Sequence, residues 1–214
     1  MELPSDKIII GLTGGIGCGK STVVDVFKNK FSDKYFFLCA DELCHEVYYD
    51  YATELNKNFI KHWNESFINE EGVINRKDIA NKIFANENYL SELSFLSAVL
   101  NPYIFKKAQE RIATASQKFI IFDIPLLFES NLETYFEAVI GVWCSKEKQN
   151  QRLLKRGYSK TEVEFRKKAQ LSADIKLELA DYAIINNGSL NELVEQCKII
   201  DKKLRVKYDR KKTK

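Results

Sequence analysis

The sequence predicts an α/β fold, with a five-stranded parallel sheet flanked by helices. Short apolar runs alternate along the chain with segments in which apolar residues recur at spacings of three and four. Strands that alternate with helices in this way are typical of parallel sheets, whose strands are joined by right-handed crossovers. The 214 residues are 45% hydrophobic, which suits one such domain with insertions.

A glycine-rich loop follows the first apolar run. Residues 14–21 read GGIGCGKS and match the phosphate-binding pattern G-x-x-x-x-G-K-[ST] at every fixed position. Glycines let backbone N–H groups surround phosphate oxygens, while Lys20 adds a positive charge and Ser21 offers a hydroxyl to Mg²⁺. The alternative is a turn that binds nothing, but a strand-like run before it and a helix pattern after it favour a P-loop NTPase fold. The predicted nucleotide contacts are Gly14, Gly15, Ile16, Gly17, Cys18, Gly19, Lys20, Ser21 and Thr22.

Two aspartates follow later strands of the predicted sheet. Asp41 comes shortly after the second strand and Asp123 directly after the third. Ligands of open parallel sheets lie at the carboxyl ends of the strands, so both carboxylates should converge on the loop. Asp123 is predicted to hold Mg²⁺ together with Ser21. Asp41 is predicted either to accept a proton from an attacking hydroxyl or to cap the helix that follows it. The strands after the first are predicted at residues 35–39, 119–122, 138–143 and 182–185.

A helical insert separates the second strand from the third. Glu71-Gly72 marks a turn within it, and Asn75 is a predicted helix start. Proline lacks a backbone N–H and restricts the residue before it, so we expect a helix to break at Asn101-Pro102. A further helix should then run from about Tyr103 to Ser116.

A second helical insert, between the fourth and fifth strands, is predicted to form a lid. Arg152 and Arg156 are four residues apart and should share one helix face, and Ser159 starts a capping box. Guanidinium groups neutralise charge on transferred phosphoryl oxygens, so we expect at least one of Arg152, Arg156 and Arg166 to touch phosphate. The alternative is a solvated helix face. The predicted division is a core of residues 1–40, 118–145 and 181–206, an insert of residues 41–117, a lid of residues 146–180 and a basic tail of residues 207–214.

Charge and composition disfavour several other classes of protein. Residues 202–214 carry a net charge of +7, which leaves −4 for the rest, so a nucleic-acid groove on the folded domain is not expected. No apolar stretch approaches 18 residues, and little chain precedes the first strand, so we expect a cytoplasmic protein without a signal sequence or membrane partner. The five cysteines are scattered, which favours reduced thiols over disulfides or a zinc site. The expected form is a monomer or small homo-oligomer.

Together these motifs resemble the dephospho-coenzyme A kinases over nearly the whole chain. The DIPLLFE segment is the most discriminating, because a generic P-loop kinase has no reason to contain it. The family pattern differs at Cys39, Asn75 and Asn101, where the family usually has Asp, Asp and His. The matching segments are GLTGGIGCGKST (11–22), ADELCH (40–45), EGVINR (71–76), LNP (100–102), DIPLLFE (123–129), QNQRLLKR (149–156) and ADYAIINNG (180–188).

The resemblance implies transfer of the ATP γ-phosphoryl group, with Mg²⁺, to the ribose 3′-hydroxyl of dephospho-coenzyme A. It implies that Asp41 is the general base, acting with Lys20 and Arg152 as catalytic residues. Arg152, Arg156, Asn187 and Gly188 would contact the nucleotide. The implied acceptor contacts are Asp41, His45, Arg76, Leu126, Leu127 and Glu129.

Several alternatives stay open at this point. Packing or pairing within the insert alone would also explain His45 and Arg76. A nucleoside or nucleoside-monophosphate kinase is the nearest rival on the same scaffold. A P-loop regulatory ATPase that signals through a partner is a different class of function.

Overall fold

The computed structural model describes residue 4 and residues 6–209, which fall into two compact units. The core unit holds the described residues up to Phe37 and from Ala115 onward, and the insert unit holds Leu38–Thr114. The predicted tail extends beyond the described residues from position 210. Among the described helices, none is both long and apolar enough to cross a membrane.

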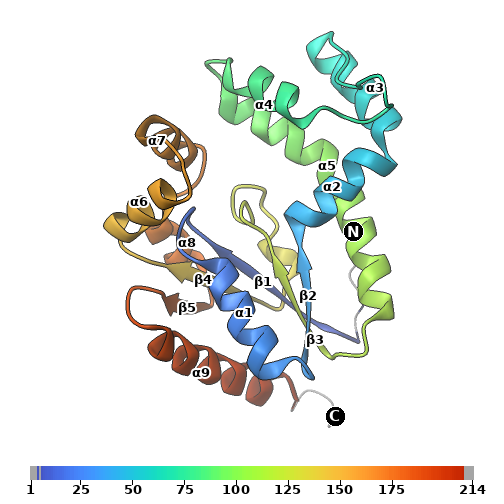
Figure 1. The fold of residues 1–214 in the computed structure, drawn as a ribbon. Coiled ribbons are helices and arrows are strands. Elements are labelled where there is room, and N and C mark those ends of the chain that lie inside the picture. The colour runs from blue at the N-terminus through green and yellow to red at the C-terminus, as the bar shows by residue number, and fades with distance from the viewer. Residues whose placement is uncertain (1–3, 5, 210–214) are drawn as a thin grey trace. The chain divides into compact units, whose positions relative to one another are not determined.

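The sheet has five strands in the order β2-β3-β1-β4-β5 (Figure 1). Strand β1 pairs in parallel with β3 and with β4, and β4 pairs in parallel with β5. The predicted parallel sheet is therefore confirmed. Because β1 lies at its centre, the loop that follows β1 emerges in the middle of the carboxyl edge. The strands are β1 Ile8–Gly14, β2 Tyr35–Cys39, β3 Phe119–Asp123, β4 Ala138–Trp143 and β5 Tyr182–Ile185.

Helices α1 and α9 lie together over the sheet, whereas α8 packs against β4 and β1 (Figure 1). Helices α6 and α7 follow β4 and lie beyond its carboxyl end. The predicted capping box at Ser159 is confirmed at the start of α7, where the Ser159 and Glu162 side chains bond each other's backbone N–H. The helices of the core unit are α1 Lys20–Phe31, the 3₁₀ turn η1 Glu133–Tyr135, α6 Lys146–Lys155, α7 Lys160–Lys168, α8 Ala173–Leu179 and α9 Leu190–Asp209.

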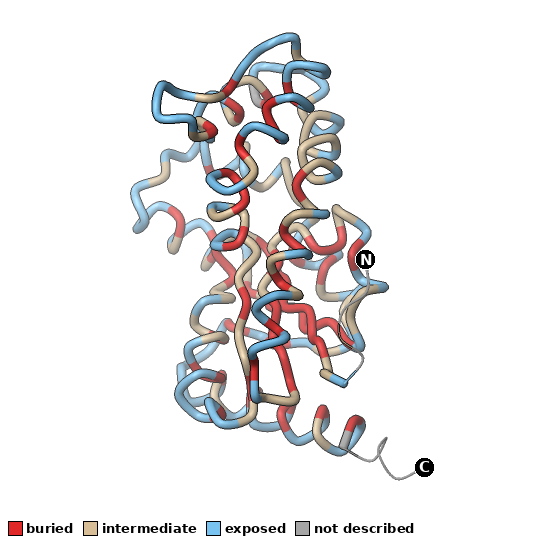
Figure 2. The backbone as a smooth tube through the Cα atoms, turned by 90° about the vertical axis from the view of Figure 1, so that its right-hand side faces the viewer, coloured by how far each residue is buried: buried red, intermediate tan, exposed pale blue. Residues whose placement is uncertain are grey.

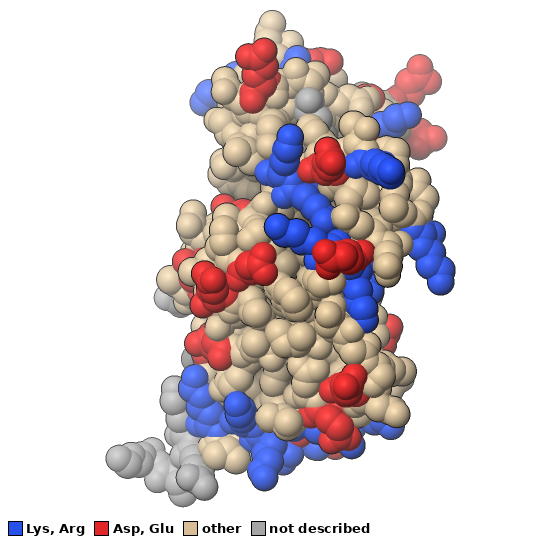
Figure 3. Space-filling model, turned by 90° about the vertical axis from the view of Figure 1, so that its left-hand side faces the viewer, with Lys and Arg blue, Asp and Glu red and all other residues tan. Residues whose placement is uncertain are grey.

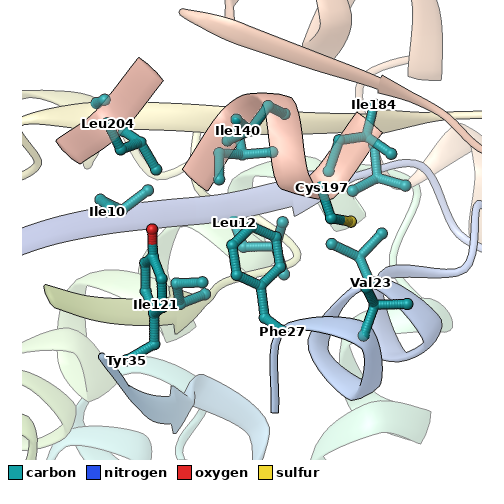
Figure 4. Packing of buried hydrophobic residues seen from close by; sticks show 14 of the residues in the cluster. Ile10, Leu12, Val23, Phe27, Tyr35, Ile121, Ile140, Ile184, Cys197 and Leu204 are labelled. Carbon is teal, nitrogen blue, oxygen red and sulfur yellow. The ribbon is translucent and has the colours of Figure 1, made fainter. Parts of the chain in front are cut away.

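The hydrophobic core lies between the sheet and helices α1 and α9. Most residues of β1, β3 and β4 are buried (Figure 2), and Figure 4 shows Ile10 and Leu12 of β1 among side chains from the helices. The ring of Phe27 lies 5.1 Å from that of Tyr35, edge to face. The Tyr35 hydroxyl donates to the buried carboxylate of Asp201 at 3.1 Å, so α9 is fixed to β2 by a polar contact as well as by packing.

The insert unit is a set of four helices. Helix α2 packs along α5, and the Arg111 guanidinium of α5 donates to Glu46 of α2 at 2.8 Å. Asn75 caps α4 by accepting from the N–H groups of Lys77 and Asp78, as predicted. A single antiparallel bridge joins Ile68 to Ile74 before that cap. The helices are α2 Ala40–Asp50, α3 Ala52–Trp63, α4 Arg76–Phe84 and α5 Tyr89–Thr114.

The predicted helix break at Asn101-Pro102 is wrong. Helix α5 runs without interruption from Tyr89 to Thr114, with Pro102 inside it. Proline removes one backbone hydrogen bond, but a continuous buried stripe outweighs that loss. The stripe recurs at spacings of four, one, three and four residues, and consists of Leu100, Ile104, Phe105, Ala108 and Ile112.

Candidate active site

The glycine-rich loop joins the end of β1 to the start of α1. Gly17 and Gly19 have φ angles of 78° and 88°, which side chains with a Cβ rarely adopt. The N–H of Cys18 donates to the carbonyl of Gly15 at 3.0 Å, closing a tight turn. Gly19 is the N-cap of α1, so the positive end of that helix dipole begins at Lys20.

Two side chains hold the backbone carbonyls of this loop. The Arg152 guanidinium donates to the carbonyl oxygens of Gly17 at 3.2 Å and Cys18 at 3.1 Å. The Asn186 side-chain amide donates to the same Cys18 oxygen at 2.8 Å. Arg152 also donates to the carbonyl of Asn186 at 3.1 Å, so the two holders are joined to each other. We call Arg152 and Asn186 the carbonyl clasp.

The carbonyl clasp determines where the loop N–H groups point. In a planar trans peptide the C=O and the following N–H point in opposite directions. The Cys18 carbonyl faces the clasp, so the Gly19 N–H faces the opposite side. An anion bound on the side toward which the Gly19 N–H points would meet backbone N–H groups and the start of α1. The loop is therefore shaped to receive phosphate with its polar supports already bonded.

The Cys18 side chain supports the loop from beneath. It is fully buried, and its sulfur accepts from the Gln149 side-chain amide at 3.0 Å. A hydrogen bond with Cys144 and the one from Gln149 lower the pKa of Cys18 to about 6, against the effect of burial. Cys144 also donates to the Gly17 carbonyl at 3.7 Å. Among the predicted nucleotide contacts, Cys18 can thus act only through its backbone.

Asp123 ends β3 beside the strand that leads into the loop. It is in register with Leu12 of β1, and the next N–H, that of Ile124, donates to the Leu12 carbonyl at 2.9 Å. Ser21 lies in the first turn of α1 with its residue exposed. A carboxylate and a hydroxyl are hard oxygen donors of the kind Mg²⁺ prefers, so these residues fit a magnesium ion by their chemistry.

The lid region has α6 at its base. Arg152 lies in α6 and is half-buried where it contacts the loop. Arg156 is exposed and is the C-cap of the same helix. The Arg156 N–H donates to the Arg152 carbonyl at 3.2 Å, so the two residues lie one turn apart at the end of α6. Arg166 lies 4.7 Å from the Tyr158 ring, which holds its guanidinium near the α6–α7 turn. Figure 3 shows that basic and acidic side chains are intermixed on the face that carries α6 and α7.

A cavity of about 610 Å³ opens beside the loop within the core unit. Gly15 and Ile16 form one wall, the end of β4 another, and α7 with the segment before α8 a third. Its basic side chains are Lys146, Lys167 and Lys168. The loop and the lid region thus enclose a space of the size that small-molecule sites occupy.

The predicted adenine-side residues follow β5. The Asn187 side-chain oxygen accepts from the Ser145 N–H at 3.1 Å, which ties this turn to the end of β4. The Lys148 ammonium donates to the Asn187 carbonyl. Gly188 is exposed next to it. The turn is therefore fixed beside the clasp residue Asn186.

In the insert unit, α2 and α4 carry three of the predicted acceptor residues. Asp41 does not cap α2, because the N-cap is Cys39, and its exposed carboxylate lies in the first turn. His45 is one turn further along the same face. Arg76 of α4 donates to the His45 ring, with 2.9 Å between its Nη1 and Nδ1, and lies 5.7 Å from the Tyr48 ring. Burial raises the pKa of the neighbouring Cys44 to about 11, which leaves it a neutral thiol.

The DIPLLFE segment follows β3 in the core unit. Leu126 is half-buried. Leu127 is fully buried, and its side chain fills the space that a Cβ on Gly11 would need. One Glu129 oxygen accepts from the Leu171 N–H and from the Lys176 ammonium, both at 2.8 Å. This segment therefore packs under β1 and contacts the chain that returns from the lid region.

Three polar residues at the site were not found from the sequence. Gln149, Asn186 and Lys176 are all buried, and each bonds the loop or the segment after β3. Their partners lie far away in the chain, so no local spacing marks them. The one available signal was the polar residue Asn186 directly after an apolar strand, at the edge where ligands lie.

The chain is similar to known proteins over most of its length. The family model for dephospho-CoA kinase matches residues 8–192. A dephospho-CoA kinase of Bdellovibrio bacteriovorus is 33% identical over 190 residues, covering 87% of this chain and 91% of that protein. A dephospho-CoA kinase of Bacillus licheniformis is 35% identical over 193 residues, covering 88% and 92%.

Solved structures give the same result. The crystal structure of TT1252 from Thermus thermophilus matches with a TM-score of 0.77 and 29% identity, over 94% of this chain and 99% of that one. A dephospho-CoA kinase from Campylobacter jejuni matches with a TM-score of 0.63 and 26% identity, over 92% and 96%.

Replacing Gly19 tests the carbonyl clasp. A Cβ at Gly19 would lie 2.2 Å from the Asn186 amide nitrogen, so Gly19→Ala should displace Asn186 from the Cys18 carbonyl. Losing a buried hydrogen bond costs about 1–3 kcal/mol, so we expect the Kd for Mg·ATP to rise about tenfold or more in calorimetry.

Gly72→Ala is the matched control. Gly72 also has a positive φ, 77°, but nothing lies within 4 Å of the position that a methyl group would take there, so the substitution brings backbone strain without a clash. Its Kd for Mg·ATP should equal that of the wild type. Equal Kd values for Gly19→Ala and Gly72→Ala would contradict the role given to the clasp.

Proposed function

The chain belongs to the dephospho-CoA kinase family, and from this premise we propose that it transfers the ATP γ-phosphoryl group to the ribose 3′-hydroxyl of dephospho-coenzyme A. The product is coenzyme A, so this is the last step of coenzyme A synthesis. The observation that carries the proposal is a phosphate loop whose carbonyls are held by Arg152 of α6 and by Asn186, directly after β5. The chain that contains this loop matches the family from residue 8 to residue 192.

On the donor side, the loop N–H groups and Lys20 bind the β- and γ-phosphates. Ser21 and Asp123 hold Mg²⁺, which when bound neutralises charge on the phosphate oxygens. Asn187 and Gly188 line the adenine. Support comes from the fixed turn after β5 and from the oxygen donors in the first turn of α1 and at the end of β3.

On the acceptor side, Asp41 accepts the proton of the 3′-hydroxyl as that oxygen attacks phosphorus. Its carboxylate is exposed and is not the N-cap of its helix, which supports a role toward a substrate. His45 and Arg76 bind the acceptor as a hydrogen-bonded pair. Leu126 and Glu129 line the same substrate, with Leu127 packed behind them.

The lid arginines stabilise the charge that develops during transfer. Arg152 acts through the loop that it holds and from the edge of the phosphate site. Arg156 is exposed, which leaves it able to reach phosphate when the lid closes. We place the reaction in the cytoplasm, with the small molecules ATP and dephospho-coenzyme A as partners.

Replacing Asp41 tests the proposed general base. Asp41→Asn keeps the shape of the side chain but cannot take up the proton, so kcat should fall by about 10²-fold or more with ATP affinity nearly unchanged. Glu42→Gln, an exposed neighbour in the same helical turn, is the control and should retain kcat. A wild-type kcat in Asp41→Asn would remove Asp41 from the mechanism.

A comparison of acceptors tests the substrate. With Mg·ATP as donor, kcat/KM for dephospho-coenzyme A should exceed that for AMP, CMP and adenosine by at least about 10²-fold, because binding of the pantetheine arm contributes to positioning. A preference for a nucleotide without that arm would favour a nucleoside-monophosphate kinase. Slow ATP hydrolysis with no phosphorylated acceptor would favour a regulatory ATPase.

A further inference from the structure

Lys176 is a fully buried ammonium group that the proposed mechanism does not use. It lies on α8 with 0% of its surface exposed, and burial lowers its pKa. A buried charge is retained only where partners satisfy it. The Lys176 Nζ donates to the Pro125 carbonyl at 2.5 Å and to Glu129 Oε1 at 2.8 Å. Both partners belong to the segment that follows Asp123.

The Lys176–Glu129 pair joins three segments of the core unit. The Pro125 carbonyl also accepts from the Thr13 hydroxyl at 3.2 Å, at the end of β1. Glu129 Oε1 also accepts from the Leu171 N–H at 2.8 Å, where the chain returns from α7 to α8. The end of β1, the segment after β3 and the base of the lid region therefore share one buried polar junction.

The position of this junction points to catalysis more than to stability. Thr13, whose hydroxyl donates to the Pro125 carbonyl at this junction, is the residue directly before the glycine-rich loop. Glu129 Oε2 is buried without a hydrogen-bond partner among the described residues. Replacing a buried ion pair by apolar residues often stabilises a protein. An ion pair with one carboxylate oxygen left without a hydrogen bond is therefore poorly explained by stability alone.

The junction contacts two segments at one point: the one after Asp123, a proposed magnesium ligand, and the one after the helix that carries Arg166. Pro125 is two residues after Asp123, so fixing its carbonyl limits the direction in which the Asp123 carboxylate leaves β3. Leu171 is five residues after Arg166, so fixing its N–H anchors the helix that carries this guanidinium. Because phosphoryl transfer depends on positioning, loosening this point should reduce the rate of transfer.

We propose that Lys176 and Glu129 are a positioning pair that fixes the returning end of the lid region to the segment after Asp123. Lys176 has no exposed surface with which to meet a ligand, so the pair acts through the elements that it joins. This proposal rests on the proposed kinase function for its kinetic part. Its structural part, the anchoring of residues 157–172, is independent of the substrate.

The test uses two variants of Glu129 in the full chain. Glu129→Leu removes both hydrogen bonds, whereas Glu129→Gln keeps an acceptor oxygen but removes the charge. Glu178→Gln, on the exposed side of α8, is the matched control. We measure amide hydrogen exchange in residues 157–172, and kcat and KM for ATP and for dephospho-coenzyme A.

The pair predicts faster exchange of residues 157–172 in Glu129→Leu, with α1 unchanged. The proposal also predicts that kcat of Glu129→Leu falls about tenfold or more below wild type, with a nearly unchanged KM for ATP. Misplacing a group that acts in the transition state lowers the rate of transfer more than it lowers the affinity for ATP. Glu129→Gln should lose less than Glu129→Leu in both measurements, and Glu178→Gln should lose nothing. The Gln variant also serves if the Leu variant fails to fold.

Two results would overturn the pair. If kcat of Glu129→Leu stays within about twofold of wild type despite faster exchange, the Lys176–Glu129 pair contributes to local stability only. An increased KM for dephospho-coenzyme A with unchanged exchange and unchanged kcat would leave Glu129 only the acceptor contact given above and would remove its positioning role. If the wild type itself fails to phosphorylate dephospho-coenzyme A, the proposed function fails, while the exchange measurement still decides whether the pair anchors the lid region.

Discussion

The capture of the Cys18 carbonyl by Arg152 and Asn186 is the contact on which the site depends. It turns the loop N–H groups toward the phosphate side without a ligand. It also requires α6 and the end of β5 to meet the loop at fixed places, which the parallel sheet order provides. Because the loop is already ordered, less of the free energy of nucleotide binding is lost to ordering it.

Much of the core could be predicted from the sequence because its signals are local. Short apolar runs predicted all five strands, and the strand order places Asp123 beside β1. The break at Pro102 was predicted wrongly, because the prediction weighed only the one backbone hydrogen bond that proline removes and not the packing of the helix. The α5 helix instead responds to a buried stripe that packs on its neighbours.

The supports of the site could not be predicted in the same way. Three buried polar residues bond groups that are distant in the sequence: Asn186, Gln149 and Lys176. The identity of one polar residue in the sequence does not indicate such a distant partner. Asp41 shows the converse case. The sequence left a cap and a base equally open, and the structure removes the cap because Cys39 occupies that position.

The position of the new phosphate is the most direct check on the proposed function. Phosphorus NMR of the product formed from dephospho-coenzyme A and Mg·ATP distinguishes a ribose 3′-phosphate from the other monoesters. The proposed function predicts a single new phosphomonoester on the 3′-oxygen, with a spectrum identical to that of coenzyme A. Phosphate on the 2′-oxygen or on the pantetheine hydroxyl, or free phosphate without a phosphorylated acceptor, would contradict it.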